Sequence, residues 1–389
     1  MPRVRHPTTN SQDRRDRGLR RICEKMRDIF IMNGALIAVR RIVNDRSLLI
    51  RGGLIHSVGR RPPPPGATVI DASGLYVSPG FIDCHIHGEA RKVLKNEIPH
   101  GTTSVVIAIS CAPLGAIYDE AARLKDFIRN DPLGASVIGF RLEGPYINPL
   151  KAGAQDRRYI RGGGVKELSR ILARCGGPLK IMTIAPELGS AGPMIRLLRD
   201  RGVIASIGHT YADYKEARRG VRMGISHATH IFNAMRSRKE GGPGAAEAAL
   251  SDPGVVAEVI PDLVHVGEKR LRHIFKKKGA GKTILVTDSI AASGGSAARR
   301  TGGAYRFRDG RLAGSSITMM DGIRNVVTRC GAGLAAAVYM ATMNPARLLG
   351  VDARKGSLEA GKDADLVILD RHFNVKMTVL RGRIAHRSA

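Results

Sequence analysis

Two histidines separated by one residue, His85 and His87, close an apolar run at residues 81–87. Successive side chains of a β-strand point to opposite faces, so residues i and i+2 project from the same face and both imidazoles can reach one ion. The pair alone is a weak signal, because a chain with 12 histidines contains such a triplet by chance with appreciable frequency. It indicates a candidate metal site that needs further ligands.

Further imidazole and carboxylate groups stand where other apolar runs end. These residues are Glu143, His209, His230 and Asp288. Any one of them could be a structural partner of a loop amide. If the runs are the parallel strands of a barrel, however, their carboxyl ends form one catalytic face, and side chains far apart in the sequence meet there.

The chemistry of these groups favours metal-dependent hydrolysis. Imidazole and carboxylate ligands without a thiolate suit Zn²⁺, Fe²⁺, Mn²⁺ or Co²⁺, and a catalytic site keeps one position open for water. A Lewis-acidic ion lowers the pKa of bound water towards about 7 and polarises a carbonyl. We expect Asp288 to be the base that takes the proton of the water and returns it to the leaving group.

The elements that must position these residues are strands alternating with helices. Apolar runs of strand length occupy residues 81–87, 103–109, 136–142, 180–185, 203–208, 225–230, 255–260 and 283–288. Helical periodicity occupies residues 114–129, 165–174, 194–201, 212–223 and 269–278. Eight strands with intervening helices predict an α/β fold, a (β/α)8 TIM barrel, over residues 79–345.

The sequence pattern at the two ends of the chain differs from that of the barrel. Short strands broken by turns are expected at residues 29–39, 47–50, 54–58, 68–70, 365–369 and 376–380. Because the terminal segments are alike and flank the barrel, they predict one small β-sandwich domain built from residues 27–78 and 346–389. Residues 1–26 are predicted to form a disordered basic extension.

The composition and charge of the chain limit which other classes of protein are possible. The chain has 389 residues and 63 Lys and Arg against 34 Asp and Glu, a net charge of +29. This charge keeps a nucleic-acid-binding protein as a remote alternative, but 8 Phe, 8 Tyr and no Trp provide few stacking platforms. The five cysteines are scattered without a C-x-x-C pair, which favours a reducing compartment and predicts a cytoplasmic protein. No apolar run is long enough to cross a membrane.

The chain resembles the amidohydrolase superfamily, in particular its N-acetylglucosamine-6-phosphate deacetylase family, from about residue 30 onward. The matching stretches are PGFIDCHIHG at 79–88, LEGPY at 142–146, APE at 185–187, GHT at 208–210, ATHIFNAM at 228–235, VTD at 286–288, GSSIT at 314–318, NPA at 344–346 and GSLEAGKDAD at 356–365. Together these motifs are highly specific.

The resemblance implies roles for particular residues. Glu143, His209 and His230 would hold the principal metal, and His85 and His87 would complete a second site that Glu143 bridges, so one or two ions are expected. Asp288 would act as general acid and base and as a weak metal ligand, and His265 would stabilise the negative charge that develops during the reaction. Residues implied to contact the substrate are Ala154, Gln155, Asn233, Ala234, His265, Leu312, Ala313 and Gly314. A homodimer with a shared active site is also implied.

Two departures from the family pattern bear on the substrate. Gln155 replaces a histidine that the family commonly has. Gly241 falls where the family places an arginine that binds the 6-phosphate across the dimer interface, and glycine offers no such contact. Arg236, Arg238 and Lys239 lie nearby and are candidate substitutes. The leading prediction is hydrolysis of the acetyl group of an N-acetylated amino sugar, first of all N-acetylglucosamine-6-phosphate, to the free amine and acetate. An unphosphorylated N-acetylhexosamine and another N-acyl amide stay open as alternative substrates.

Overall fold

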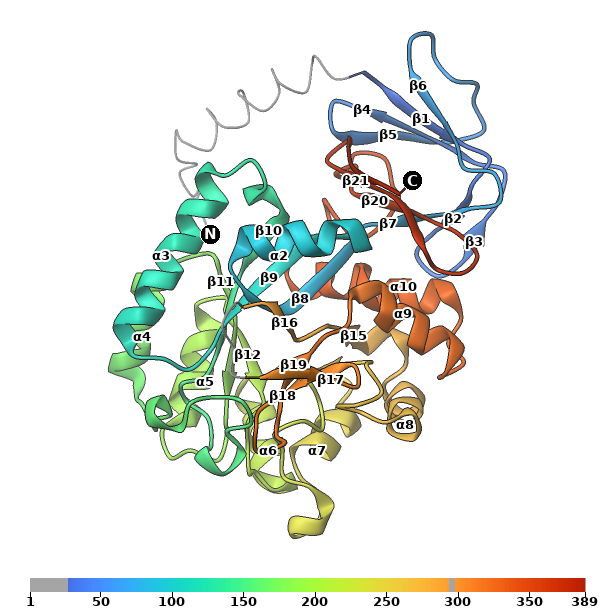
Figure 1. The fold of residues 1–389 in the computed structure, drawn as a ribbon. Coiled ribbons are helices and arrows are strands. Elements are labelled where there is room, and N and C mark those ends of the chain that lie inside the picture. The colour runs from blue at the N-terminus through green and yellow to red at the C-terminus, as the bar shows by residue number, and fades with distance from the viewer. Residues whose placement is uncertain (1–26, 294–297, 389) are drawn as a thin grey trace, which may run out of the picture.

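The computed structural model describes residues 27–293 and 298–388. The predicted extension at residues 1–26 lies outside this part of the chain. Figure 1 shows a curled sheet of parallel strands wrapped by helices, with a smaller group of strands to one side. The predicted TIM-type barrel with a small β domain is therefore confirmed.

The eight predicted barrel strands all form, and several are shorter than expected. Their bounds are β8 Phe81–Gly88, β9 Thr102–Ile109, β10 Val137–Glu143, β11 Leu179–Ile184, β12 Ile204–Ile207, β13 His227–Ala228, β14 Val256–Val259 and β15 Thr283–Leu285. The segment after β15 closes the barrel. On one side the Val286 N–H donates to Val259 O at 3.1 Å, and on the other the Asp288 N–H donates to His85 O at 2.8 Å.

Helices cover the outer face of the strands. The five predicted helices are α3 Leu114–Asn130, α4 Val165–Cys175, α5 Ala191–Asp200, α6 Tyr214–Met223 and α8 Glu268–Lys278. Five further helices of the described residues were not predicted: α2 Ala90–Glu97, α7 Ala245–Ser251, α9 Met319–Thr328, α10 Leu334–Ala341 and α11 Met343–Leu348. Among the described helices none combines the length and apolarity that a membrane crossing requires.

The barrel sheet continues beyond its closure into a small extension with both parallel and antiparallel pairs, which was not predicted. It contains β16 Ser289–Ala292, β17 Arg299–Thr301, β18 Ala304–Arg306 and β19 Leu312–Ser315. Because β16 pairs with β8 and β19 pairs with β16, this extension lies beside the first barrel strand. Its strands β18 and β19 form a hairpin whose turn is discussed below.

Strands from both ends of the chain form the β domain, as the blue and red ribbons of Figure 1 show. One sheet has the order β5-β4-β1-β6, with β1 Ile29–Met32, β4 Ser47–Arg51, β5 Leu54–Gly59 and β6 Thr68–Asp71. The other has the order β22-β21-β20-β7-β2-β3, with β2 Ala35–Ile37, β3 Ile42–Val43, β7 Tyr76–Pro79, β20 Leu366–Leu369, β21 Val375–Leu380 and β22 Arg383–Arg387. One apolar cluster with members from both sheets, including Ile31, Ile50, Ile368 and Val379, joins them.

The prediction of one strand at residues 29–39 is wrong. The run divides into β1 and β2, which belong to different sheets. Asn33 adopts a φ of 63°, a left-handed conformation that ends the first strand. At Gly34 an added Cβ would lie 2.7 Å from Val77 Cγ2, so only glycine fits this crossing. The chain changes sheet here because both residues permit a sharp turn.

The core of the barrel has two apolar parts, as strand alternation requires. Val105 and Ile107 belong to the large cluster that includes the covering helices. Val106, between them, belongs to a smaller cluster with Ile181 and Ile284 of other strands. Adjacent residues of one strand thus face opposite sides, and the barrel interior is filled by side chains.

Burial of Glu97, the last residue of α2, leads us to predict that the free energy of unfolding depends on pH. Its side chain is 4% exposed, and its Oε2 has no hydrogen-bond partner among the described residues. Burial raises the pKa of Glu97 from 4.5 to about 8, with Asp83 and Asp321 adding repulsion. The folded state then binds a proton that the unfolded chain releases, so stability falls by about 1.4 kcal/mol per unit as the pH rises between these values.

We expect Glu97→Gln to remove this decline, because a neutral amide does not ionise. Urea unfolding at a series of pH values measures the effect, with Glu120→Gln on the exposed face of α3 as the control. Equal slopes of stability against pH in wild type and Glu97→Gln would contradict the prediction.

Candidate metal and active site

The candidate ligands come from the carboxyl ends of several barrel strands. Glu143 is the last residue of β10, and His85 and His87 belong to the end of β8. His209, His230 and Asp288 lie just beyond their strands and have φ values of 48°, 26° and 49°. Such positive values are uncommon for residues with a Cβ and tend to occur at functional sites. The structure thus brings all six predicted ligand residues to one end of the barrel.

Glu143, His209 and His230 form the first ligand group, in which the ligand atoms lie within 4.8 Å of one another. Glu143 Oε1 is 2.9 Å from Nε2 of each histidine, and the two Nε2 atoms are 3.2 Å apart. His209 Nδ1 is 2.9 Å from the carbonyl oxygen of Lys151, which only accepts. Nδ1 of His209 therefore carries a proton, and Nε2 is the ring nitrogen that is left to bind a metal ion.

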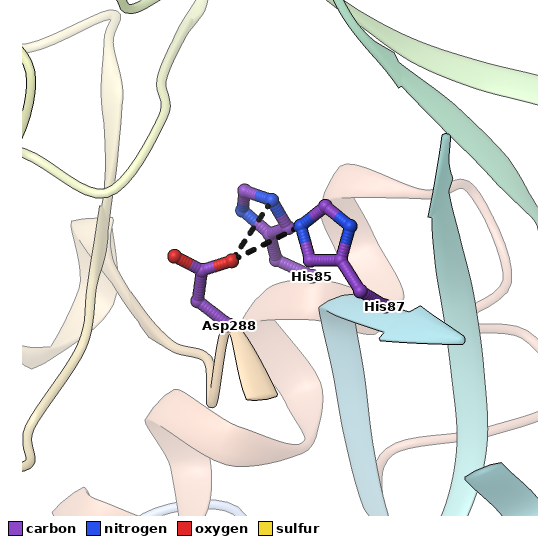
Figure 2. Close-up of side chains that lie close together, drawn as sticks. All are labelled: His85, His87 and Asp288. Atoms are coloured by element: carbon purple, nitrogen blue, oxygen red, sulfur yellow. Dashed lines mark ion pairs between the residues drawn. The ribbon is translucent and has the colours of Figure 1, made fainter. Parts of the chain in front are cut away.

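His85, His87 and Asp288 form the second group. Figure 2 shows both imidazoles facing the carboxylate of Asp288. Asp288 Oδ1 lies 3.4 Å from His85 Nε2 and 3.2 Å from His87 Nε2. The position of the two histidines on one strand, with one residue between them, lets both rings reach the same oxygen.

Glu143 lies between the two groups. Its Oε1 faces His209 and His230, while its Oε2 is 3.5 Å from His85 Nε2 and 3.3 Å from His87 Nε2. Burial alone would raise the pKa of Glu143, but the surrounding histidines outweigh it and hold the pKa well below the ordinary value. The carboxylate is therefore ionised and can bridge two cations.

The donor set fits a divalent cation. Three lone-pair atoms of the first group converge within 3.2 Å, an arrangement that repels without protons or a cation between them. In the second group His85 Nε2 is buried without a hydrogen-bond partner among the described residues. An unsatisfied buried polar atom is costly, and a metal ion would satisfy it. Nitrogen and oxygen ligands without sulfur suit the metals named above.

A buried charge network that the sequence analysis missed orients His85. Glu258 of β14 accepts from His85 Nδ1 at 2.5 Å and from Arg141 Nη1 at 2.6 Å, and all three residues are fully buried. The Nδ1 proton is thereby fixed, so Nε2 of a neutral His85 is free for a ligand. Arg141 and Glu258 could have been noticed as charges in the middle of apolar strand runs.

One pocket of about 400 Å³ opens over both groups. Every residue predicted for the site lines it except His85, which lies behind the wall. The predicted residues on the wall are His87, Glu143, Ala154, Gln155, His209, His230, Asn233, Ala234, His265, Asp288, Leu312, Ala313 and Gly314. Residues that the sequence analysis missed also line it: Ser110, Gly153, Ile290, Ser293, Phe307 and Arg311.

His265 is fixed on the pocket wall by a carboxylate. Its Nδ1 is 2.5 Å from Asp262 Oδ2, and Asp262 Oδ1 accepts from the His265 N–H at 2.8 Å. Because the carboxylate accepts, Nδ1 carries a proton, and Nε2 is the ring atom left for the pocket. The sequence analysis did not include Asp262, although it precedes His265 by only three residues.

The three proposed substitutes for the phosphate-binding arginine do not line the pocket. Arg236 Nη2 donates to Gly241 O at 2.8 Å, and Arg238 Nε donates to Glu247 Oε1 at 2.8 Å. Lys239 is exposed. A Cβ at position 241 would lie 2.2 Å from Arg236 Nη2, so the Arg236 side chain fills the space beside Gly241.

Gln155 holds the carboxylate of Glu143. The Cys111 N–H donates to Gln155 Oε1 at 2.7 Å, and Gln155 Nε2 donates to Glu143 Oε2 at 2.8 Å. The amide orientation is determined because a backbone N–H must face the oxygen. The residue is 6% exposed, so both bonds are buried. The departure from the family pattern thus retains a donor to Glu143.

We expect Gln155→Leu to lower the free energy of unfolding by about 1–3 kcal/mol, because it leaves the Cys111 N–H and Glu143 Oε2 without these partners. Gln155→His, which supplies both a donor and an acceptor, should recover part of the loss. Chemical denaturation of the metal-free protein measures both. Equal stability of Gln155→Leu and wild type would show that these bonds contribute nothing.

The chain is similar to a known protein family and to named relatives within it. The model of the Amidohydrolase family matches residues 76–385. The chain is 32% identical over 383 residues to the N-acetylglucosamine-6-phosphate deacetylase of Bacillus subtilis, covering 92% of this chain and 97% of the relative. It is 31% identical to the N-acetylgalactosamine-6-phosphate deacetylase of Escherichia coli O157:H7, covering 88% and 95%.

Two solved structures that are similar to this chain carry the same enzyme name as the Bacillus subtilis relative. The N-acetylglucosamine-6-phosphate deacetylase of Pasteurella multocida superposes with a TM-score of 0.86 at 26% identity, covering 93% of this chain and 100% of the other. A variant of the Mycobacterium smegmatis enzyme in complex with N-acetyl-D-glucosamine-6-phosphate gives a TM-score of 0.84 at 30% identity, covering 92% and 99%.

Proposed function

Because the chain belongs to the amidohydrolase family, we propose that it removes the acetyl group of N-acetylglucosamine-6-phosphate and releases glucosamine-6-phosphate and acetate. The observation that carries this proposal is the convergence of Glu143, His209, His230 and Asp288 on one pocket at the carboxyl ends of the barrel strands. The names of the most similar relatives support the substrate.

The cofactor of this reaction is one or two divalent ions, with Zn²⁺ or Fe²⁺ as first candidates. Glu143, His209 and His230 would hold one ion, and His85, His87 and Asp288 would hold a second with Glu143 as the bridge. When bound, such an ion supplies Lewis acidity, which activates water and polarises the acetyl carbonyl.

The side chains of the pocket supply the proton transfers. Asp288 accepts a proton from the attacking water and delivers it to the amide nitrogen, so that the C–N bond breaks and a free amine leaves. His265 is held through Nδ1 by Asp262, so a hydrogen bond from its Nε2 would stabilise the negative charge that develops on the carbonyl oxygen. Asn233, Ala234 and the 312–314 segment line the pocket and would contact the sugar.

Metal analysis with a small panel of N-acetyl sugars tests the proposal. We expect purified protein to contain divalent metal, to release acetate from N-acetylglucosamine-6-phosphate, and to lose this activity with a chelator until metal is restored. Absence of acetate release from every sugar tested, by protein with a full metal complement, would refute the proposal.

A second candidate keeps the same machinery and changes the substrate to an unphosphorylated N-acetylhexosamine or another N-acyl amine. Gly241, which offers no side chain to a phosphate, favours it. Matched kinetics of N-acetylglucosamine with and without the 6-phosphate separate the candidates, since equal kcat/KM values would mean that the phosphate is not recognised. An N-acetylgalactosamine pair decides between the two hexosamines.

We also propose that the protein works as a cytoplasmic homodimer. The four cysteines among the described residues are all free, which agrees with a reducing compartment. Size-exclusion chromatography with light scattering tests the dimer, and a monomeric mass at micromolar concentration would contradict it.

A further inference from the structure

A guanidinium group borders the pocket on the side of the β18–β19 hairpin. Among the described residues that line the pocket, Arg311 is the one Lys or Arg side chain. It immediately precedes Leu312, Ala313 and Gly314, which also form the wall. The cations at 236, 238 and 239 lie away from the pocket, so Arg311 is the fixed positive charge that a bound anion would meet.

Contacts on several sides hold the Arg311 side chain. Its Nη1 donates to Gly153 O at 2.9 Å, across the pocket in the loop that contains Ala154 and Gln155. Its Nε donates to Asp309 Oδ2 at 2.7 Å, and its Cζ lies 5.2 Å from the centre of the Phe307 ring. The side chain thus spans from the hairpin to the opposite loop, and little conformational entropy remains to be lost on binding.

The guanidinium keeps donor capacity for a ligand. No hydrogen bond among the described residues engages Nη2, and Nη1 is bonded to a neutral carbonyl oxygen. A phosphate oxygen accepts a stronger, charge-assisted bond than a carbonyl oxygen, so it can compete for Nη1 while a second oxygen binds Nη2. Asp309 opposes an anion, but its side chain and that of Arg311 are 52% and 56% exposed, and water screens the repulsion.

We propose that Arg311 recognises a phosphate monoester on the sugar from within the same subunit, and so determines the preference for a phosphorylated substrate. This inference depends on the proposed deacetylase function. It explains how the phosphate is bound although Gly241 offers no side-chain contact. No arginine from a second copy of the chain is then required. A planar guanidinium suits this role because it presents two N–H groups to two phosphate oxygens.

The test compares kcat/KM for N-acetylglucosamine-6-phosphate and for N-acetylglucosamine in Arg311→Ala and in Arg308→Ala. Arg308 is exposed on the same hairpin turn and does not line the pocket, so its loss changes the net charge equally. We expect Arg311→Ala to lower kcat/KM about 10- to 100-fold for the phosphorylated sugar, mainly through KM. Activity on the unphosphorylated sugar should fall much less, because across the pocket only the bond from Arg311 to Gly153 O is lost for that substrate.

Arg311→Lys should recover only part of the preference, because an ammonium keeps the charge without the two-pronged contact. An unchanged ratio of the two kcat/KM values in Arg311→Ala would overturn the inference. The same loss in Arg308→Ala would also overturn it, because the effect would then come from overall charge.

Binding measurements keep this inference separate from the proposed function. If the wild type hydrolysed neither sugar, the deacetylase proposal would fail. Calorimetric binding of glucosamine-6-phosphate and of glucosamine to the metal-loaded protein would still decide the role of Arg311. We expect a phosphate-dependent gain in affinity that Arg311→Ala removes. Equal affinity of wild type and Arg311→Ala for glucosamine-6-phosphate would refute it.

Discussion

Asp288→Asn is expected to lower kcat by about a thousandfold or more while the protein keeps metal at the Glu143, His209 and His230 group. Proton transfer by a positioned side chain contributes roughly 10²–10⁴ in rate, and a neutral amide cannot accept the proton of the water. His85 and His87 outweigh burial and hold the pKa of Asp288 below its ordinary value, so the wild-type carboxylate is ready to act as a base at neutral pH.

The measurement is steady-state acetate release together with metal content by mass spectrometry. Asp126→Asn is the matched control, because Asp126 is exposed on α3 and its carboxylate accepts from Asn130 far from the pocket. Activity within about tenfold of wild type in Asp288→Asn would remove the proposed acid and base role. Complete loss of metal would instead assign Asp288 to binding alone.

Glu258→Gln is expected to lower the free energy of unfolding by about 3–5 kcal/mol, because it leaves Arg141 as a buried charge without its partner. Glu258 also accepts from His85 Nδ1 and from the His230 N–H, so the same change loosens two candidate ligands. The loss of such an outer partner typically weakens metal affinity by about 10- to 100-fold.

Urea unfolding and metal titration measure these two effects, with exposed Glu120→Gln as the control. Addition of Arg141→Met to Glu258→Gln should recover part of the stability, since the unpaired charge is then gone. Equal stability of Glu258→Gln and wild type would show that the buried pair gives no net stabilisation.

The acid dependence of stability provides a second measure of Glu258. Burial alone would raise its pKa, but Arg141 and His85 hold the pKa well below the ordinary value of 4.5. The stability that this carboxylate contributes is therefore present above that value and is lost as the pH falls through the lower folded pKa. Glu258→Gln should reduce the loss of stability in acid.

The barrel was predictable because its strands and helices differ in hydrophobic period. The first strand shows this well: an apolar run ending in His85 and His87 predicts both its position and which side chains share a face. The short β13 was predicted as part of a longer strand at residues 225–230, of which only His227 and Ala228 form strand. The β16–β19 extension and α10 were missed, because their sequences carry weak periodicity and many small residues. Helix α9 was missed although its buried residues Met319, Ile323 and Val326 follow a helical period.

The sequence by itself determined which residue types stand at strand ends, and hence the candidates His85, His87, Glu143, His209, His230 and Asp288. Only the tertiary structure revealed Glu258 and Arg141, whose pairing depends on strands far apart in the sequence meeting inside the barrel. The same holds for Gln155, whose two bonds depend on Cys111 and Glu143 lying on either side of it. Arg311 borders the pocket only because the hairpin folds over the mouth, which no local pattern encodes.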